Sequence, residues 1–332
     1  KFHRCFSWMV VGAAGAGAGA PGGRVETGPE QLTLRRLALN APSPADVVVD
    51  VEWTGISTGT ERLLYSGRMP PFPGLGYPLV PGYETVGRVV EAGAESGRRI
   101  GERVFVAGAR CFEGARGLFG GAAERLVVPG AKALPLAEPV GQEGVLLALA
   151  ATAYHAAWGA GGSAPDLIVG HGALGRLLAR LATVLEPARP VTVWETNPAR
   201  QGGALGYRVI DPAQDERRDY RTIVDMSGDD ALVDQLIGRL APGGELVLAG
   251  FYHHPIRFEF VPAFLREARI RVAAEWKPTD LAKVTEMVNT GALPLDGIIT
   301  HRVEAGQAAE AYTTAFGDPS CVKMILDWSH TA

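Results

Sequence analysis

The chain has 332 residues, which at about 150 residues per domain suggests two domains. Hydrophobic residues make up 47% and charged residues 20%, with a formal net charge of −4, so disorder over the whole chain is excluded. This balance, without a basic block, argues against nucleic acid as the main partner, and no uninterrupted apolar stretch is long enough for a membrane span. Three cysteines are too few for a disulfide framework or a Cys₄ zinc site, so we expect a cytoplasmic protein.

The amino end is the first place where the 43 glycines gather. From Val11 to Gly23 the chain is almost entirely glycine and alanine without periodicity, and such tracts behave as flexible coil. The preceding residues, a basic start and an apolar centre, bear a faint likeness to a secretory signal, which the glycines dilute. We therefore expect residues 1–23 to be a disordered extension outside the fold.

Residues 24–139 have the pattern of a β domain. Short runs typical of strands, such as Asp46–Trp53, Thr85–Ala92 and Ala122–Pro129, are separated by glycine and proline. Strands of this length with frequent turn signals indicate an all-β, barrel-like unit whose corners need those two residue types.

Residues 140–285 change to alternating strands and helices. Continuous apolar strands at 166–170, 191–195 and 222–225 alternate with helices expected at 144–158, 173–185, 198–205 and 230–240. This order predicts parallel β/α units in a doubly wound sheet covered on both faces. Residues 286–332 return to strand patterning at 298–303 and 321–326, and we expect them to close back onto the first domain.

A G-x-G-x-x-G motif lies between the strand at 166–170 and the following helix. Its first glycine suits a tight turn, its second lets backbone N–H groups approach a pyrophosphate, and its third permits close helix–strand packing. Glu195 ends the next strand, at the spacing of the acid that binds the ribose hydroxyls, which favours NAD over NADP, although Arg200 lies nearby. The expected cofactor-binding residues are Gly170, Gly172, Ala173, Leu174, Gly175 and Glu195. The loops at 225–228 and 249–252 follow the next two strands and are expected to contact the same cofactor.

These features together resemble the medium-chain dehydrogenase/reductase superfamily over about residues 24–328. The resemblance implies a GroES-like catalytic domain at 24–139, a Rossmann domain at 140–285, and completion of the catalytic domain by 286–332. In the zinc enzymes of that superfamily, three positions hold a catalytic metal, and the matching positions here carry Ser57, Tyr83 and, in the third case, Ala148. Because zinc requires thiolate, imidazole or carboxylate ligands, we expect no metal site.

Without zinc, another group must polarise the substrate hydroxyl or take its proton. The catalytic candidates are Tyr83, Ser57, Thr60 and His155. Tyr83 is the first choice, Ser57 and Thr60 are relays or merely bond the turn backbone, and His155 is an alternative base or a buried structural histidine. Glu84 is expected to be a structural carboxylate, and Glu61 to form a local ion pair with Arg62.

The stretches at 55–64, 69–84 and 118–123 resemble a narrower family, the dehydrogenases of bacteriochlorophyll biosynthesis that oxidise a 1-hydroxyethyl substituent to acetyl. That resemblance implies a tetrapyrrole substrate, a bacteriochlorophyllide or chlorophyllide, with NAD⁺ as acceptor. It is compatible with a homo-oligomer and with peripheral contact to other pigment-synthesis enzymes. The segment with Met69, Phe72, Leu75 and Tyr77, stiffened by prolines, then suits the wall of a wide apolar pocket, or else is an ordinary surface loop.

Two other functions stay open at the level of sequence. A zinc-independent quinone or enoyl reductase of the same superfamily would prefer NADPH, against which Glu195 argues. A dinucleotide-binding protein without turnover, such as a redox sensor or pigment carrier, would bind pigment without converting it.

Overall fold

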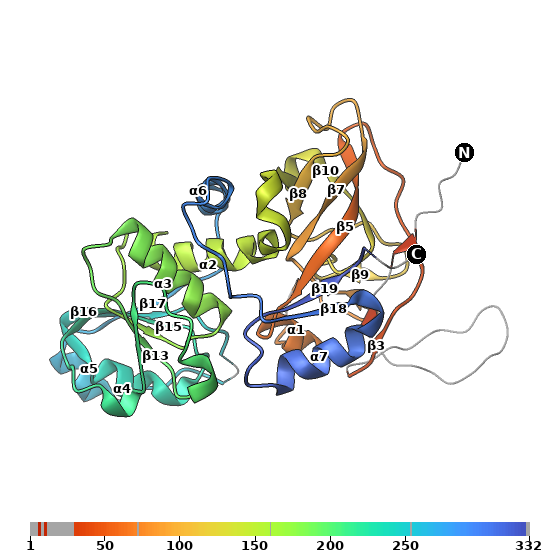
Figure 1. Ribbon diagram of the computed structural model, residues 1–332. Helices are drawn as coiled ribbons and strands as arrows, with labels where there is room; N and C mark the ends of the chain where they lie inside the picture. Colours follow the sequence, from red (N-terminus) through yellow and green to blue (C-terminus); the bar gives the residue numbers. More distant parts are fainter. Residues whose placement is uncertain are drawn as a thin grey trace. The chain divides into compact units, whose positions relative to one another are not determined.

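A computed structural model describes residues 6–7, 10–11, 30–71, 73–159, 161–252 and 254–329. The chain forms two compact units, one of residues 1–146 with 299–332 and one of residues 147–298 (Figure 1). Most of the predicted extension at 1–23 lies outside the described residues, as does Phe72. Within the described part of the chain, every helix is too short or too polar to cross a membrane.

The first unit is built around one long strand, β5 (Asp46–Ile56). Its sheet has the order β11-β8-β7-β5-β19-β18, and β10 pairs with β5 as well. These strands are β7 (Thr85–Ala92), β8 (Arg103–Val106), β10 (Arg125–Pro129), β11 (Ala133–Pro135), β18 (His301–Glu304) and β19 (Met324–Asp327). A small two-stranded sheet pairs β1 (Phe6–Ser7) with β4 (Leu37–Ala38). A four-stranded sheet has the order β3-β2-β6-β9, made of β3 (Leu32–Thr33), β2 (Val10–Val11), β6 (Leu79–Val80) and β9 (Arg116–Gly117).

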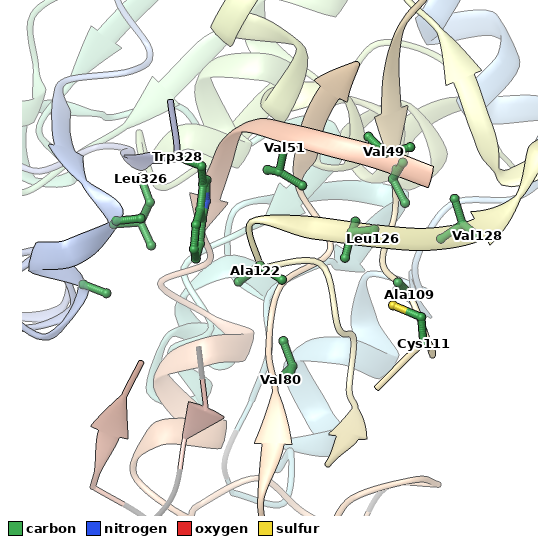
Figure 2. Close-up of a cluster of buried hydrophobic side chains, with 14 of the residues drawn as sticks. Val49, Val51, Val80, Ala109, Cys111, Ala122, Leu126, Val128, Leu326 and Trp328 are labelled. Carbon is green, nitrogen blue, oxygen red and sulfur yellow. The ribbon is translucent and has the colours of Figure 1, made fainter. Parts of the chain in front are cut away.

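The length of β5 lets it bond three strands, since β10 pairs with its residues 46–50, β19 with 53–56 and β7 with 47–54. Val47, Val48, Val49 and Val51 are buried, so residues on both faces of the strand pack inward. Figure 2 shows Val49 and Val51 beside Leu126 and Trp328 in this apolar cluster. Two register shifts along the β5–β7 pair bend the sheet, as a closed, barrel-like unit requires. The predicted barrel-like β domain is thereby confirmed.

The carboxyl-terminal segment supplies β18, β19 and a helix to the same unit. β19 pairs antiparallel with β5, with Leu326 opposite Thr54. The helices of the unit are α1 (Thr60–Tyr65), α7 (Ala308–Gly317) and the short 3₁₀ turns η1 (Gly130–Lys132), η2 (Glu138–Leu146) and η6 (Ala305–Gln307).

The second unit is a six-stranded parallel sheet in the order β14-β13-β12-β15-β16-β17. Its strands are β12 (Leu167–Val169), β13 (Thr192–Trp194), β14 (Arg208–Ile210), β15 (Tyr220–Asp225), β16 (Leu240–Leu248) and β17 (Arg269–Val272). Its helices are α2 (Leu147–Trp158), α3 (Ala173–Leu185), α4 (Val233–Ile237), α5 (Phe260–Leu265) and α6 (Pro278–Asn289), with 3₁₀ turns η3 (Pro198–Arg200), η4 (Pro212–Gln214) and η5 (Asp230–Leu232). The predicted doubly wound Rossmann sheet is confirmed.

Several predicted bounds differ from the observed ones. The helix expected from residue 144 begins at Leu147, because the preceding residues form η2. The helix expected at 198–205 is a single 3₁₀ turn, and the one expected at 230–240 is η5 followed by α4, which ends at Ile237 before the buried strand residue Leu240.

The unit boundaries lie after residues 146 and 298, whereas the sequence suggested 139 and 285. Two groups of contacts account for the difference. The 3₁₀ segment η2 packs on β5, β7 and β8 of the first unit, which extends that unit beyond residue 139. The buried Leu293 and Leu295, with a hydrogen bond from Arg180 to the Pro294 carbonyl, hold the later segment in the second unit.

Candidate functional site

The turn between β12 and α3 carries the glycine motif. Gly170 has φ +99°, a left-handed conformation that favours glycine. A Cβ on Gly175 would lie 1.9 Å from the Gly170 carbonyl oxygen, so only glycine lets the helix approach the strand this closely. A Cβ on Gly172, by contrast, would meet no protein atom within 4 Å. The structure therefore leaves space beside Gly172 at the amino-terminal end of α3, where backbone N–H groups of Ala173 and Leu174 can receive a phosphate.

Glu195, directly after β13, is held at the edge of this turn. Its Oε2 accepts a hydrogen bond from the His171 backbone N–H at 3.1 Å, and its Oε1 accepts one from the Asn197 N–H at 2.8 Å. These two backbone donors hold the carboxylate beside the glycine turn. An acid that accepts hydrogen bonds from ribose hydroxyls has to lie at this position. The structure thus brings Glu195 together with the predicted glycines.

His171, the residue between the first two motif glycines, is fully buried. Its Nδ1 lies 2.6 Å from the Arg200 carbonyl oxygen, and its Nε2 lies 2.9 Å from the Tyr207 hydroxyl. Because a carbonyl can only accept, Nδ1 carries the proton and Nε2 accepts from Tyr207. Burial is the main cause that lowers the pKa of His171 to about 4, and Arg176 adds to the shift. Arg176 also donates to the carbonyls of His171 and Arg200, which braces the two loops.

Two further loops meet the glycine turn at the carboxyl ends of their strands. Ser227 N lies 3.5 Å from the place of a Cβ on Gly170, and Gly250 packs directly on Gly228. The buried Asp225 accepts hydrogen bonds from Ser227 and from the Tyr252 hydroxyl, at 2.7 Å in the second case. Three loop ends therefore surround one edge of the sheet, the place where such folds bind dinucleotides.

In the first unit, three of the predicted catalytic residues come together. The Tyr83 hydroxyl lies 2.8 Å from Ser57 Oγ, and the Thr60 side chain also hydrogen-bonds to the Tyr83 phenol. Ser57 Oγ accepts the Thr60 backbone N–H at 3.3 Å, so the serine has a turn-forming role as well. Burial, reinforced by the neighbouring Glu84, raises the pKa of the Tyr83 phenol, which therefore stays protonated.

A buried ionic cluster lies behind these hydroxyls, and the sequence did not predict it. The Lys323 ammonium pairs with the Glu84 carboxylate and donates to the Ile56 carbonyl at 2.9 Å. Glu61 Oε2 accepts the Ser57 N–H at 2.8 Å. The predicted Glu61–Arg62 ion pair is wrong: Glu61 is buried whereas Arg62 is exposed, because neighbouring helix residues point in different directions.

His155 belongs to the second unit, on α2. Its Nδ1 lies 2.7 Å from Asp280 Oδ2, which also accepts the Lys277 N–H at 2.8 Å at the start of α6. A carboxylate oxygen accepts, so Nδ1 is the donor in this hydrogen bond. This geometry suits a base, and it equally suits a structural tie between α2 and α6.

The positions that match zinc ligands carry groups that do not fit the metal, since Ser57 and Tyr83 bond one another and Ala148 is a buried methyl group. Over the described ranges, no three His, Cys, Asp or Glu side chains are placed to hold a metal ion.

The proline-rich loop packs on α1. Met69 and Leu79 are buried against Leu63 and Leu64, with Leu75 and Tyr77 partly buried around them. The Tyr77 hydroxyl donates to the Leu64 carbonyl at 2.5 Å. These contacts hold the loop against α1, and the two form one apolar layer.

Comparison with known proteins agrees with this architecture. Residues 43–138 match the family described as the alcohol dehydrogenase GroES-like domain. A dehydrogenase from Escherichia coli complexed with NADH has a TM-score of 0.77 at 20% identity, covering 97% of this chain and 99% of that one. A dehydrogenase from Sinorhizobium meliloti bound to NADP has a TM-score of 0.78 at 20% identity, covering 98% and 100%. At this identity the likeness shows the fold.

Two curated relatives are much more similar. A 2-desacetyl-2-hydroxyethyl bacteriochlorophyllide A dehydrogenase from Rhodobacter capsulatus is 57% identical over 305 residues, 92% of this chain and 97% of the relative. The enzyme of the same description from Cereibacter sphaeroides is also 57% identical, over 92% and 98% of the two chains.

Proposed function

This chain belongs to the family of 2-desacetyl-2-hydroxyethyl bacteriochlorophyllide A dehydrogenases, and from that membership we propose that it oxidises the hydroxyethyl substituent of a bacteriochlorophyllide or chlorophyllide to acetyl. The observation that carries the proposal is 57% identity over nearly the full length of both chains. The two-unit architecture, with a glycine turn open to a phosphate and a hydroxyl cluster in the other unit, supports a dehydrogenase.

NAD is the proposed cofactor. Gly170, Gly172 and Gly175 with the first turn of α3 would hold the pyrophosphate, and Glu195 would accept the ribose hydroxyls. When bound, the oxidised nicotinamide accepts the hydride that leaves the carbinol carbon. The Glu195 carboxylate would repel a 2′-phosphate, which supports NAD over NADP. A measured kcat/KM that is higher with NADP⁺ than with NAD⁺ would contradict this choice.

The oxidation is proposed to proceed without zinc. Tyr83, as a neutral phenol with Ser57 and Thr60 behind it, is the group that hydrogen-bonds the substrate oxygen and passes its proton on. His155, oriented by Asp280, is the alternative base. Elemental analysis should find less than one zinc per chain, with activity unaffected by chelators, and stoichiometric zinc would contradict this reading of the site.

The deciding experiment is a pigment assay. Purified protein incubated with the 3-(1-hydroxyethyl) pigment and NAD⁺ should produce NADH and a red-shifted absorption band, because the new acetyl group enters conjugation. Pigment binding without NADH or spectral change in a folded preparation would refute the proposal and favour a carrier. NADPH-dependent reduction of a quinone or enone would favour the alternative reductase.

A further inference from the structure

An exposed arginine lies against the proline-rich loop. Arg116 is the first residue of β9, which pairs with β6 directly after the loop. Its backbone N–H donates to the Pro78 carbonyl at 2.9 Å. The strand pairing therefore fixes the backbone from which this side chain extends, while the side chain itself is open to solvent.

Gly76 provides the space for this side chain on the loop. A Cβ at Gly76 would lie 2.6 Å from Arg116 Nε and 3.1 Å from Arg116 Cζ, so the guanidinium occupies the place that another side chain would fill. The chain neighbours of this glycine, Leu75 and Tyr77, pack on the apolar cluster of the loop and α1. The cation is therefore held over the loop backbone at a point flanked in sequence by two apolar residues.

The guanidinium of Arg116 is not neutralised by the chain. Within the described ranges, it has neither a carboxylate oxygen within 4.0 Å nor a side-chain hydrogen bond. By contrast, Arg88, Arg103 and Arg125 of the same unit each pair with an acid. A guanidinium presents a planar set of N–H donors that matches the two oxygens of a carboxylate. Arg116 can therefore bind an acidic group that comes from outside the chain.

The segment that carries Arg116 also reaches Tyr83. Leu118, two residues later, is buried in the apolar cluster, and the next residue, Phe119, packs on that cluster. The Phe119 ring meets the Tyr83 ring edge-on, with the two centroids 5.3 Å apart. One apolar layer therefore extends from the loop beneath the guanidinium to the phenol that we propose as the catalytic group.

The proposed substrate has chemistry that matches these features. A bacteriochlorophyllide or chlorophyllide is a flat, largely apolar macrocycle, and as a free acid it carries a propionate carboxylate on its edge, away from the hydroxyethyl group. Sites for such ligands combine a wide apolar surface with a few polar groups that set the orientation. A cation at one place on the layer and a phenol at another provide two such groups.

We infer that Arg116 is a specificity-determining residue that binds the propionate carboxylate of the pigment. The macrocycle then lies on the loop layer, and the hydroxyethyl oxygen meets Tyr83. This inference rests on the proposed function. The carboxylate takes no part in the oxidation, so Arg116 binds it equally in the ground state and in the transition state. Uniform binding of this kind lowers KM and leaves kcat the same.

The test compares two forms of one pigment, the free acid and its methyl ester, which lacks the charge but keeps the hydroxyethyl group. Oxidation of each by the full-length protein with NAD⁺ is measured in the same detergent, and the ratio of the two kcat/KM values is the readout. Arg116→Gln removes the cation and keeps a polar side chain. Lys132→Gln, at an exposed lysine on η1 of the same unit, is the control for loss of one positive charge.

The wild type and the Lys132→Gln control should prefer the free acid by about 10-fold, a modest value because solvent screens an exposed pair. Arg116→Gln should raise KM for the free acid and bring the ratio close to one. A role limited to holding the loop would instead change the rates with acid and ester alike, and so would keep the ratio.

Gly76→Ala tests the position of the cation without removing it. The new Cβ would lie 2.6 Å from Arg116 Nε and would displace the flexible end of that side chain. The acid-to-ester ratio of this variant should therefore fall between those of the wild type and Arg116→Gln. A ratio equal to that of the wild type would show that the guanidinium does not act from its place on the loop, against the inference.

Two further results separate this inference from the proposed function. A wild type that oxidises acid and ester equally well, or an Arg116→Gln variant that keeps the wild-type ratio, would overturn the role of Arg116 and leave the dehydrogenase activity established. If the wild type oxidises neither form of the pigment, the proposed function fails, and the inference fails with it.

Discussion

The neutral state of His171 makes the second unit sensitive to acid. Its pKa is lowered from 6.5 to about 4, mainly by burial, so the unfolded chain binds a proton at a pH where the folded chain does not. Stability is therefore complete above the unfolded pKa and is lost as the pH falls towards the folded one. At about 1.4 kcal/mol per pKa unit, the loss approaches about 3 kcal/mol.

His171→Asn removes the titrating group while its amide nitrogen can still donate to the Arg200 carbonyl. At neutral pH the variant should be about 1 kcal/mol less stable, because the Tyr207 hydroxyl loses its acceptor. On acidification this difference should reverse, since only the wild type pays the protonation penalty. Hydrogen exchange of β12 and β13 amides, compared between the two proteins at each pH, measures the second unit alone. A difference that stays constant from about pH 7 to about pH 4 would refute the reasoning.

Three other substitutions test the remaining geometry. Tyr83→Phe should lower the oxidation rate about 10²–10⁴-fold at unchanged NAD affinity, and a near-normal rate would move the role to another residue. Gly172→Ala should weaken dinucleotide binding in calorimetry but keep the fold, whereas Gly175→Ala should destabilise the second unit, because its Cβ would lie 1.9 Å from a carbonyl oxygen. Equal effects of the two changes would contradict this. Gly55→Ala should lower the stability of the first unit by about 3–5 kcal/mol by displacing the buried Glu84 pair, and an unchanged melting temperature would argue against it.

Patterns that are local in sequence predicted the cofactor half of the molecule well. The strand, the glycine motif and α3 are contiguous, and Glu195 follows at the end of the next parallel strand. Because parallel strands end at the same edge of a sheet, spacing alone places this acid beside the motif. The structure adds the contacts that spacing cannot show, above all the His171 bonds to Arg200 and Tyr207.

The first unit could be predicted less fully, because its site depends on contacts between distant segments. Ser57, Thr60 and Tyr83 were recognised from motifs, and they do meet. Lys323 was not, since it lies 267 residues from the Ile56 carbonyl that it bonds, and only the pairing of β19 with β5 brings it there. No periodicity in the sequence signals such a contact. The different contacts of Glu84, with Lys323, and of Glu61, with the Ser57 N–H, likewise could be known only from the structure.

Ser57 and Tyr83, at positions that match zinc ligands, lie beside the buried Glu61, Glu84 and Lys323. A metal would lower the pKa of a bound alcohol, whereas an oxidation without zinc, as we propose, passes the alcohol proton to a protein group. In this proposal Tyr83 passes its proton on, because burial raises the pKa of its phenol and the phenol stays protonated. Burial raises the pKa of Glu84, and its ion pair with Lys323 opposes this shift. Burial, reinforced by the Glu84 charge, raises the pKa of Glu61 to about 8, and the hydrogen bond that Glu61 accepts from the Ser57 backbone N–H opposes this shift.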